Sequence, residues 1–203
     1  SRARPRRMRR NIPSTRTRSS GSACFRATAL REGGENASYS REFAFSKSTG
    51  RPAVLNTKPN DSYTFEGASL LVDGYHSRPV FTSGAWLGYL DEPLDVTIDM
   101  GGEQSYRSVE LETLAEKGDW IFPPSSVTVW VSDNGTDFTE VASVAVPEAK
   151  AGDADGIGRY RMQFPETSAR YLKVVAQNAA AIPAWHPGAG SKGFLFVDEV
   201  VVE

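Results

Sequence analysis

Apolar and polar residues alternate along most of the chain with the two-residue period of β-strands. Leu, Val, Ile and Met occupy every second position of Leu94–Met100, and valine does the same over 127–131. An Asn-Gly pair at 134–135 then predicts a hairpin turn. Further strand patterns lie at 109–113, 159–164, 172–176 and 194–202. Because no window of ten residues follows the helical period, the pattern predicts an all-β, antiparallel sandwich over residues 53–203.

Two more strand patterns precede the sandwich, within residues 23–52. Cys24–Leu30 and Ser40–Ser46 flank a Gly-Gly pair at 33–34, which predicts a β-hairpin. Two strands bury little apolar surface, and isolated hairpins are marginally stable at best. We therefore expect this hairpin to pack on the main domain or on a partner.

The first 22 residues differ in composition from the rest of the chain. Residues 1–20 contain eight arginines and no acidic residue, and they show no apolar period. Such a segment buries too little surface to offset the entropy of ordering, so we expect residues 1–22 to be disordered. A basic tail that contacts anions, a solvated linker and non-native sequence all remain open.

The charge of the remaining chain argues against nucleic acid as a partner. Beyond residue 20 there are 25 Asp and Glu residues against 15 Lys and Arg residues, so the body is acidic. No run of 18 apolar residues predicts a membrane span. Residues 1–20 lack the apolar core of a signal peptide, and the single cysteine, Cys24, excludes an internal disulfide.

The chain lacks the residue patterns of a catalytic site. Its two histidines, His76 and His186, are the candidate bases for a nucleophilic triad, and neither lies near a Gly-x-Ser-x-Gly turn. Residues 153–156 have the acidic start of a calcium loop, but Phe164 stands where an EF-hand needs its last glutamate. We therefore predict that the chain is not an enzyme.

The final strand pattern contains two carboxylates in apolar surroundings. Both faces of 194–202 are apolar apart from Asp198 and Glu199, and the two-residue period places these acids on opposite faces. Burying a carboxylate is costly unless a cation accompanies it. The partner is either an arginine, such as Arg78 or Arg107, or a Ca²⁺ ion held in part by Glu199.

Five segments, taken in order, are similar to one known family. They are LVDGYHSRPVFTSGAWLGY at 71–89, LDVTIDMGG at 94–102, WIFPPSSVTVWVSDNGTDF at 120–138, ARYLKVVAQN at 169–178 and PAWHPGAGSKGFLFVDEV at 183–200. In this order and spacing they resemble the discoidin, or coagulation factor five/eight type C, domain, and within it the family 32 carbohydrate-binding modules. The resemblance implies a jelly-roll β-sandwich of about eight antiparallel strands that binds sugars on loops at one end.

The hairpin region is similar to a second type of protein. FRATALREGGENASYSREFAFSKSTGRP at 25–52 resembles the last strands of the small β-domain after the catalytic barrel of bacterial family 20 β-N-acetylhexosaminidases. The resemblance implies that residues 23–52 end such a domain and that the parent catalytic domain, a glycoside hydrolase of the chitobiase type, is a partner. It also implies a periplasmic, cell-surface or secreted bacterial protein. We expect a monomer.

The resemblance to the discoidin family also implies a calcium site. The family's Asp-Gly turn falls on Asp73-Gly74. With it, the carbonyl of Tyr75, the hydroxyl of Ser77 and the late Glu199 would bind one structural Ca²⁺ through the hard oxygen ligands that this ion prefers. This chain departs from the family's commonest form, in which a Thr and a Trp follow the turn.

Sugar sites in proteins combine aromatic rings, which pack on the apolar face of the sugar, with polar groups that bind its hydroxyls. The stacking candidates are Trp120, Phe122 and Trp185, and the hydrogen-bonding candidates are His76, Arg78, His186 and Lys192. They lie in three long connections, at 73–90, 117–124 and 178–193. We predict a glycan partner of the galactose or N-acetylhexosamine type.

Structural roles compete with binding roles for several of these residues. Trp86, between two glycines, is predicted to fill the core, and Trp130, on a strand face, to be structural or at the surface. Trp185 and His186 stand between prolines and form either a sugar-binding loop or a rigid packed one. His76 either binds sugar or shapes the calcium turn.

Three functions remain as expectations. The first is a non-catalytic carbohydrate-binding module that holds a glycosidase near glycans. The alternative is a structural or protein-contacting appendage with no sugar ligand. The third, a phospholipid- or protein-binding discoidin domain, needs apolar spikes and basic loops, which the acidic body disfavours.

Overall fold

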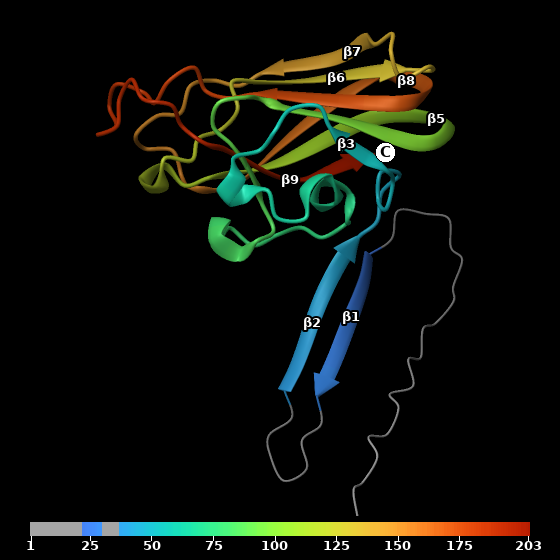
Figure 1. Ribbon diagram of the computed structural model, residues 1–203, viewed down its shortest axis with the longest axis horizontal. Helices are drawn as coiled ribbons and strands as arrows, with labels where there is room; N and C mark the ends of the chain where they lie inside the picture. The colour runs from blue at the N-terminus through green and yellow to red at the C-terminus, as the bar shows by residue number, and fades with distance from the viewer. Residues whose placement is uncertain (1–21, 30–36) are drawn as a thin grey trace, which may run out of the picture.

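A computed structural model describes the backbone of residues 22–29 and 37–203, and the side chains from residue 43 onwards. Figure 1 shows a β-sheet body from which a long two-stranded hairpin projects. The segment predicted to be disordered, residues 1–22, lies outside the described residues except for its last position.

The projecting hairpin consists of β1 (Ser22–Ala29) and β2 (Ala37–Ala44). Eight antiparallel Cα pairs run from Ser22 opposite Ala44 to Ala29 opposite Ala37. The prediction of two strands here is confirmed, although each begins a few residues earlier than predicted. The Gly-Gly turn predicted between them lies outside the described residues.

The body is one sheet of seven strands over residues 53–202, with antiparallel pairing throughout. Neighbouring strands follow the order β4-β9-β5-β8-β6-β7, and β3 pairs with β5. The shorter strands are β3 (Ala53–Leu55), β4 (Leu87–Tyr89), β6 (Ser126–Ser132), β7 (Thr139–Ala145) and β9 (Leu195–Val202). The longer ones are β5 (Leu94–Ala115) and β8 (Gly156–Gln177).

The two long strands take part in both layers of a sandwich. Up to a register shift after Asp99, β5 pairs with β3 and β8, and beyond Gln104 it pairs with β8 and then β9. Between the halves stand Gly101 and Gly102, with φ angles of 77° and 156° that favour glycine. The antiparallel sandwich is confirmed. Its sheet has seven strands. The patterns at 94–100 and 109–113 are two halves of β5, and those at 159–164 and 172–176 are two halves of β8.

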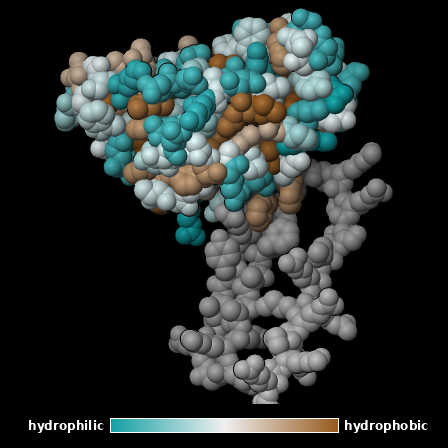
Figure 2. All heavy atoms as spheres, in the orientation of Figure 1, coloured by the Kyte–Doolittle hydropathy of each residue, from teal (hydrophilic) through white to brown (hydrophobic). Residues whose placement is uncertain are grey.

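Inward-facing residues of the two layers form the main core. Val96 and Leu111 of β5, Val129 of β6 and Val197 of β9 are among its fully buried members. Burying one such side chain contributes about 1.5–3 kcal/mol, so the alternation seen in the sequence determines which face of each strand turns inward. Figure 2 shows the visible face of the body as largely hydrophilic, with separate hydrophobic areas.

A smaller core cluster surrounds Trp86. Its ring is fully buried with Leu114, Ile121 and Phe196, and its Nε1 donates a hydrogen bond of 3.0 Å to the carbonyl of Arg78. The prediction that Trp86 fills the core is confirmed.

Four short 3-10 helices interrupt the connections. They are η1 (Asp61–Tyr63), η2 (Gly67–Val72), η3 (Phe81–Ser83) and η4 (Lys117–Asp119). In Figure 1, η1, η2 and η3 lie on the side of the body from which the hairpin projects. The sequence pattern missed these elements because turns of three to six residues are too short to show a period. None of the described helices is long and apolar enough to cross a membrane.

Candidate functional site

Four aromatic rings from the connections at 117–124 and 178–193 pack against one another. The backbone of both connections lies at the left end of the body in Figure 1. His186 lies nearly perpendicular to Trp120, Phe122 and Trp185, at centroid distances of 6.2, 5.5 and 5.5 Å. Edge-to-face packing of this kind is a favourable arrangement of rings. The structure therefore brings together four of the seven predicted sugar-site residues, and we call them the ring cluster.

His186 connects the two loops of the ring cluster. Its Nδ1 accepts a hydrogen bond of 3.0 Å from the N–H of Gly188. Its Nε2 must then carry the proton, and it lies 2.9 Å from the carbonyl of Lys117, to which it donates. Both ring nitrogens are thus engaged within the protein. In this arrangement the imidazole positions the two loops, and the predicted hydrogen bond from His186 to a sugar stays a prediction.

Trp120 is fixed in a left-handed backbone conformation at the end of η4. Its φ is 63°, and its N–H donates to the carbonyl of Lys117 at 3.0 Å. A Cβ added at Gly188 would lie 2.8 Å from Cζ2 of the indole, so the ring packs directly on this glycine. The buried Lys117 side chain pairs with Asp155 and ties the turn to the start of β8. Trp120 nevertheless remains 43% exposed.

Trp185 is fixed by its own hydrogen bond. Its Nε1 donates to the carbonyl of Ala149 at 2.9 Å, and the residue is 39% exposed. A hollow of about 340 Å³ lies beside this loop, lined by residues 122–125, 146–149 and 179–184. Among the lining residues only Ser125 and Glu148 carry polar side chains.

Phe122 supports the ring cluster from inside the protein. It is only 1% exposed, and its centroid is 6.4 Å from that of Trp185. A buried ring offers no face to a sugar. Of the three predicted stacking residues, only Trp120 and Trp185 expose their rings to solvent.

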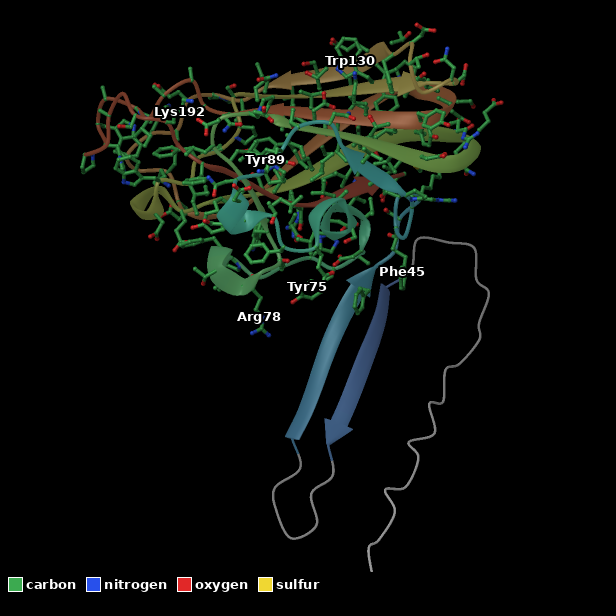
Figure 3. The ribbon with its side chains drawn as sticks, in the orientation of Figure 1. Phe45, Tyr75, Arg78, Tyr89, Trp130 and Lys192 are labelled. Carbon is green, nitrogen blue, oxygen red and sulfur yellow. The ribbon has the colours of Figure 1, made fainter. Side chains whose placement is uncertain are left out.

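The other three predicted sugar-site residues lie apart from the ring cluster. Lys192 pairs at the surface with Asp91, Nζ to Oδ1 at 2.6 Å. Figure 3 shows Lys192 toward the end of the body and Arg78 on the side facing the hairpin. In the described part of the chain, no hydrogen bond, ion pair or ring contact joins Lys192, Arg78 or His76 to the ring cluster.

His76 contacts a buried carboxylate instead. Its Nδ1 lies 2.8 Å from Oε2 of Glu112, poorly aligned for a hydrogen bond, and Arg159 pairs with the other oxygen. Burial pushes the pKa of Glu112 upward, but His76 and Arg159 outweigh burial and lower it. The same contact with Glu112 raises the pKa of His76. Sequence reasoning missed Glu112, because strand alternation places it on a polar face that only the folded loop covers.

Strand β9 carries a bulge at its two acids. Between Val197 and Val200 it advances three residues while the paired part of β5 advances two. Both valines therefore reach the core. The prediction that Asp198 and Glu199 lie on opposite faces is wrong, because the extra residue lets both carboxylates reach the same turn.

That turn, residues 73–77, binds both acids through its backbone, and we call it the acid turn. The N–H of Gly74 donates to Oε2 of Glu199 at 3.2 Å. The N–H of Ser77 donates to Oδ2 of Asp198 at 2.7 Å. These bonds satisfy one oxygen of each buried carboxylate without supplying a positive charge.

Neither predicted arginine neutralises the two acids. Arg107 pairs with Glu166 instead. Burial, followed by the charge of Asp73, raises the pKa of Glu199 to about 9. Burial raises the pKa of Asp198 to about 7. The buried surroundings of Asp198 and Glu199 therefore favour either a proton on each carboxyl group or a metal cation beside it.

A sequence model of the F5/8 type C domain matches residues 56–192. The chain belongs to the F5/8 type C family. The matched region contains the ring cluster and the acid turn and ends shortly before β9. No curated protein sequence matches the chain.

Two solved structures have the same fold as this F5/8 type C domain. Chitosan-binding module 1 from the chitosanase/glucanase of Paenibacillus sp. IK-5 is 17% identical, with a TM-score of 0.50 over 78% of this chain and 98% of that one. CpGH89CBM32-5 from Clostridium perfringens, solved in complex with GalNAc-β-1,3-galactose, is 17% identical, with a TM-score of 0.52 over 78% and 99%. At this identity the likeness establishes the fold alone. Both neighbours are carbohydrate-binding modules.

The acid turn of this F5/8 type C domain fits a hard cation. Oε1 of Glu199 is buried and has no hydrogen-bond partner among the described residues. The charge of Asp73 acts on the same carboxylate, and the Ser77 hydroxyl donates to the carbonyl of Ala85 at 3.2 Å, which leaves its lone pairs available. Carboxylate, carbonyl and hydroxyl oxygens are the ligands of Ca²⁺.

Residues 43–203 contain no group of three or more His, Cys, Asp or Glu side chains placed to hold a metal. The predicted calcium set has only two acids, Asp73 and Glu199, and is completed by the Tyr75 carbonyl and the Ser77 hydroxyl. A search for three or more such side chains therefore does not test the predicted calcium ligands, and the calcium site stays a prediction.

Proposed function

We propose that the chain is a carbohydrate-binding module in which a sugar stacks on Trp120 and Trp185. The observation that carries the proposal is that both indoles are exposed, at 43% and 39%, although each is fixed in place by contacts within the protein. A ring that is already ordered binds without losing side-chain entropy. The apolar face of a pyranose matches such a ring, and the sugar hydroxyls stay in water.

The hollow beside Trp185 favours a sugar with an apolar substituent. Its volume of about 340 Å³ lies in the usual range of ligand pockets, about 300–1,000 Å³. Its lining of alanines and prolines suits a methyl group better than a hydroxyl. Within the galactose or N-acetylhexosamine class we therefore favour N-acetylhexosamine, whose acetamido group carries such a methyl.

The proposal assigns binding, and no chemical step, to the chain. Its partner would be the catalytic domain of a glycoside hydrolase, acting in the periplasm, at the cell surface or after secretion, as the resemblance implies. A Ca²⁺ ion at Asp73, Tyr75, Ser77 and Glu199 would supply rigidity at a distance from the sugar. We expect the module to act as a monomer.

The projecting hairpin favours a second function, a structural or protein-contacting appendage. Within the described residues, β1 and β2 pair only with each other. A two-stranded sheet is marginally stable alone, so the hairpin gains stability from any protein surface that covers it. This role does not need the ring cluster.

Titration with free sugars separates the two functions. We expect N-acetylglucosamine or N-acetylgalactosamine to bind at millimolar concentration or below, measured by calorimetry or NMR. Trp120→Ala and Trp185→Ala should each weaken binding about tenfold, since losing a stacking contact worth about 1.4 kcal/mol lowers affinity by that factor.

Trp130→Ala is the matched control for these variants. This tryptophan lies on the sheet face of β6, with Nζ of Lys173 5.5 Å from its ring centroid, and it belongs to neither loop. Sugar affinity should not change. If no sugar binds at millimolar concentration, the carbohydrate-binding function is refuted and the appendage function remains.

A further inference from the structure

The acid turn holds the base of the hairpin as well as the buried carboxylates. The carbonyl of Gly74 accepts a hydrogen bond of 2.8 Å from the N–H of Ala44, the last residue of β2. The N–H of the same glycine donates to Glu199 at 3.2 Å. One residue therefore contacts both the hairpin and the buried acid, and a shift of the turn changes both contacts together.

The segment that follows β2 continues this attachment. The N–H of Gly50 donates to the carbonyl of Val72, just before the acid turn, at 2.7 Å. The N–H of Lys47 donates to the carbonyl of Val202, at the end of β9, at 3.0 Å. Residues 44–50 thus bind the acid turn, the end of η2 and the end of β9. We call residues 44–50 together with the acid turn the joint.

Aromatic side chains also pack against one another at the joint. The ring of Phe43 lies 5.9 Å from that of Tyr75 and stacks on Phe45 at 6.5 Å. Figure 3 shows Tyr75 and Phe45 where the hairpin meets the body. A Cβ at Gly74, where φ is +76°, would lie 3.1 Å from the carbonyl oxygen of Ala44. The close approach of hairpin and turn therefore requires glycine at this position.

We propose that a divalent cation bound at the acid turn fixes the hairpin to the sandwich. The proposal rests on the calcium prediction and is independent of sugar binding. In the absence of a cation, hydrogen bonds such as those from the N–H groups of Gly74 and Ser77 join the turn to Glu199 and Asp198. A cation held by Asp73, the Tyr75 carbonyl and Glu199 would immobilise residues 73–75, to which β2 is bonded.

The coupling is reciprocal, because two events that share one turn change each other's free energy equally. Cation binding stabilises the attached hairpin, and an attached hairpin raises the affinity for the cation. How firmly the hairpin is attached to the sandwich then depends on the calcium concentration around the protein. Whatever protein surface contacts the hairpin would be held rigidly at high calcium and loosely at low calcium.

Amide hydrogen exchange on the whole chain, resolved by NMR, tests the coupling. The reporters are the amides of Ala44 and Gly50, which bond to the acid turn and to η2. The controls are Val146 and Ile182, whose amides form hydrogen bonds of 2.9 and 2.8 Å near the ring cluster. At calcium one hundred times its dissociation constant, exchange of the reporters should slow by up to about 100-fold relative to EGTA. The controls lie in loops that exchange by local opening, which global stabilisation does not slow, so their exchange should change less than about twofold.

Two results overturn the proposal. Calcium that binds, by calorimetry, without slowing Ala44 and Gly50 shows that the joint is not coupled to the site. Equal slowing of reporters and controls shows general stabilisation instead. If no calcium binds, the inference fails together with the metal prediction, and the sugar titration distinguishes this from failure of the binding-module function.

A substitution outside the predicted ligand set tests the reciprocal direction. Phe43→Ala removes the ring contact with Tyr75 and should lower calcium affinity about three- to tenfold, although Phe43 supplies no ligand atom. Val54→Ala is the control, because this exposed apolar residue (62% exposed) lies on the edge strand β3 and should leave the affinity unchanged. Wild-type affinity in Phe43→Ala would refute the coupling.

Discussion

At the ring cluster, two indoles lie in water while the polar atoms around them are paired. Nδ1 and Nε2 of His186, Nε1 of Trp185 and Nζ of Lys117 all have partners in the protein. At the acid turn the arrangement is reversed, because Asp198 and Glu199 are buried and Oε1 of Glu199 has no partner among the described residues. One region exposes apolar surface, and the other buries charge.

The difference indicates which kind of ligand stabilises each region. Exposed apolar surface gains free energy when another apolar surface covers it. A buried carboxylate is stabilised when a cation binds beside it. A sugar and a cation are therefore expected at different places and with different consequences. At the same multiple of its dissociation constant each ligand stabilises the fold by the same amount. The two regions differ without their ligands, because the cation-free acid turn leaves carboxylates buried.

Removing calcium should have the largest effect on stability. When the free calcium concentration is one hundred times the dissociation constant, removing the calcium with a chelator should lower the free energy of unfolding by about 2.7 kcal/mol. For a chain of this size that corresponds to a fall in melting temperature of about 5–10 °C. Scanning calorimetry with and without EGTA measures it. The melting temperature of Glu199→Gln should not change with EGTA. A fall in that variant would contradict the assignment of Glu199 as a calcium ligand.

The metal-free protein should lose stability as pH rises. Burial raises the pKa of Asp198 to about 7 and of Glu199 to about 9 in the folded state, so between about pH 4 and pH 9 the folded chain binds more protons than the unfolded one. Stability is then greatest at low pH within this window and falls by up to about 1.4 kcal/mol per pH unit for each group. Urea unfolding in EGTA from pH 5 to pH 9 tests the sign.

In the same urea series, Glu199→Gln should flatten the upper part of this pH dependence. Glu166→Gln is the control, because Glu166 is a surface acid paired with Arg107. Stability that rose with pH in the metal-free wild type would refute the description of the acid turn.

Gly188→Ala should weaken sugar binding with little change in stability. The added Cβ would lie 2.8 Å from Trp120, so the indole must move away from its fixed position, and affinity should fall roughly tenfold. Gly118→Ala is the matched control in the neighbouring turn, because a Cβ there meets no atom within 4 Å. Equal losses in both variants would show that the position of Trp120 is not what matters.

Asp155→Asn should have the smallest effect. The variant loses the ion pair with Lys117, whose side chain is buried, but Asp155 is half exposed and screened by solvent, so the cost should be below about 1 kcal/mol. Lys117 lowers the pKa of Asp155, so the contribution is present above pH 4 and disappears as pH falls through the lowered value. The free energies of unfolding of the variant and the wild type should therefore differ at pH 7 and approach each other at pH 3.

The strands could be predicted from the sequence because each has its own local pattern. Alternation at Leu94–Met100 and at 127–131 located β5 and β6, and buried Trp86 followed from its glycine neighbours. Alternation could not show that β5 continues through a bend into the second layer. Its two halves look like separate strands until their pairing with β8 is known.

The candidate sites were predictable only in part. Aromatic residues in long loops pointed to Trp120 and Trp185, but contacts with Gly188 and Ala149, in other loops, position the two rings. The roles of Phe122 and His186 depend on burial and on hydrogen bonds to distant loops, which no local pattern contains. The same limit applies to Glu112, a polar residue on a strand that becomes buried only when the loop with His76 folds over it.

Strands β5 and β8 pair over 17 positions that extend through both layers. This shared ladder has a mechanical consequence. The glycan-anchoring role that we propose would place tension between the hairpin and the ring cluster. Two separate sheets can be pulled apart one at a time, but layers that share their two longest strands must resist the load together. Although two register shifts interrupt it, the shared ladder therefore makes the sandwich a single mechanical unit.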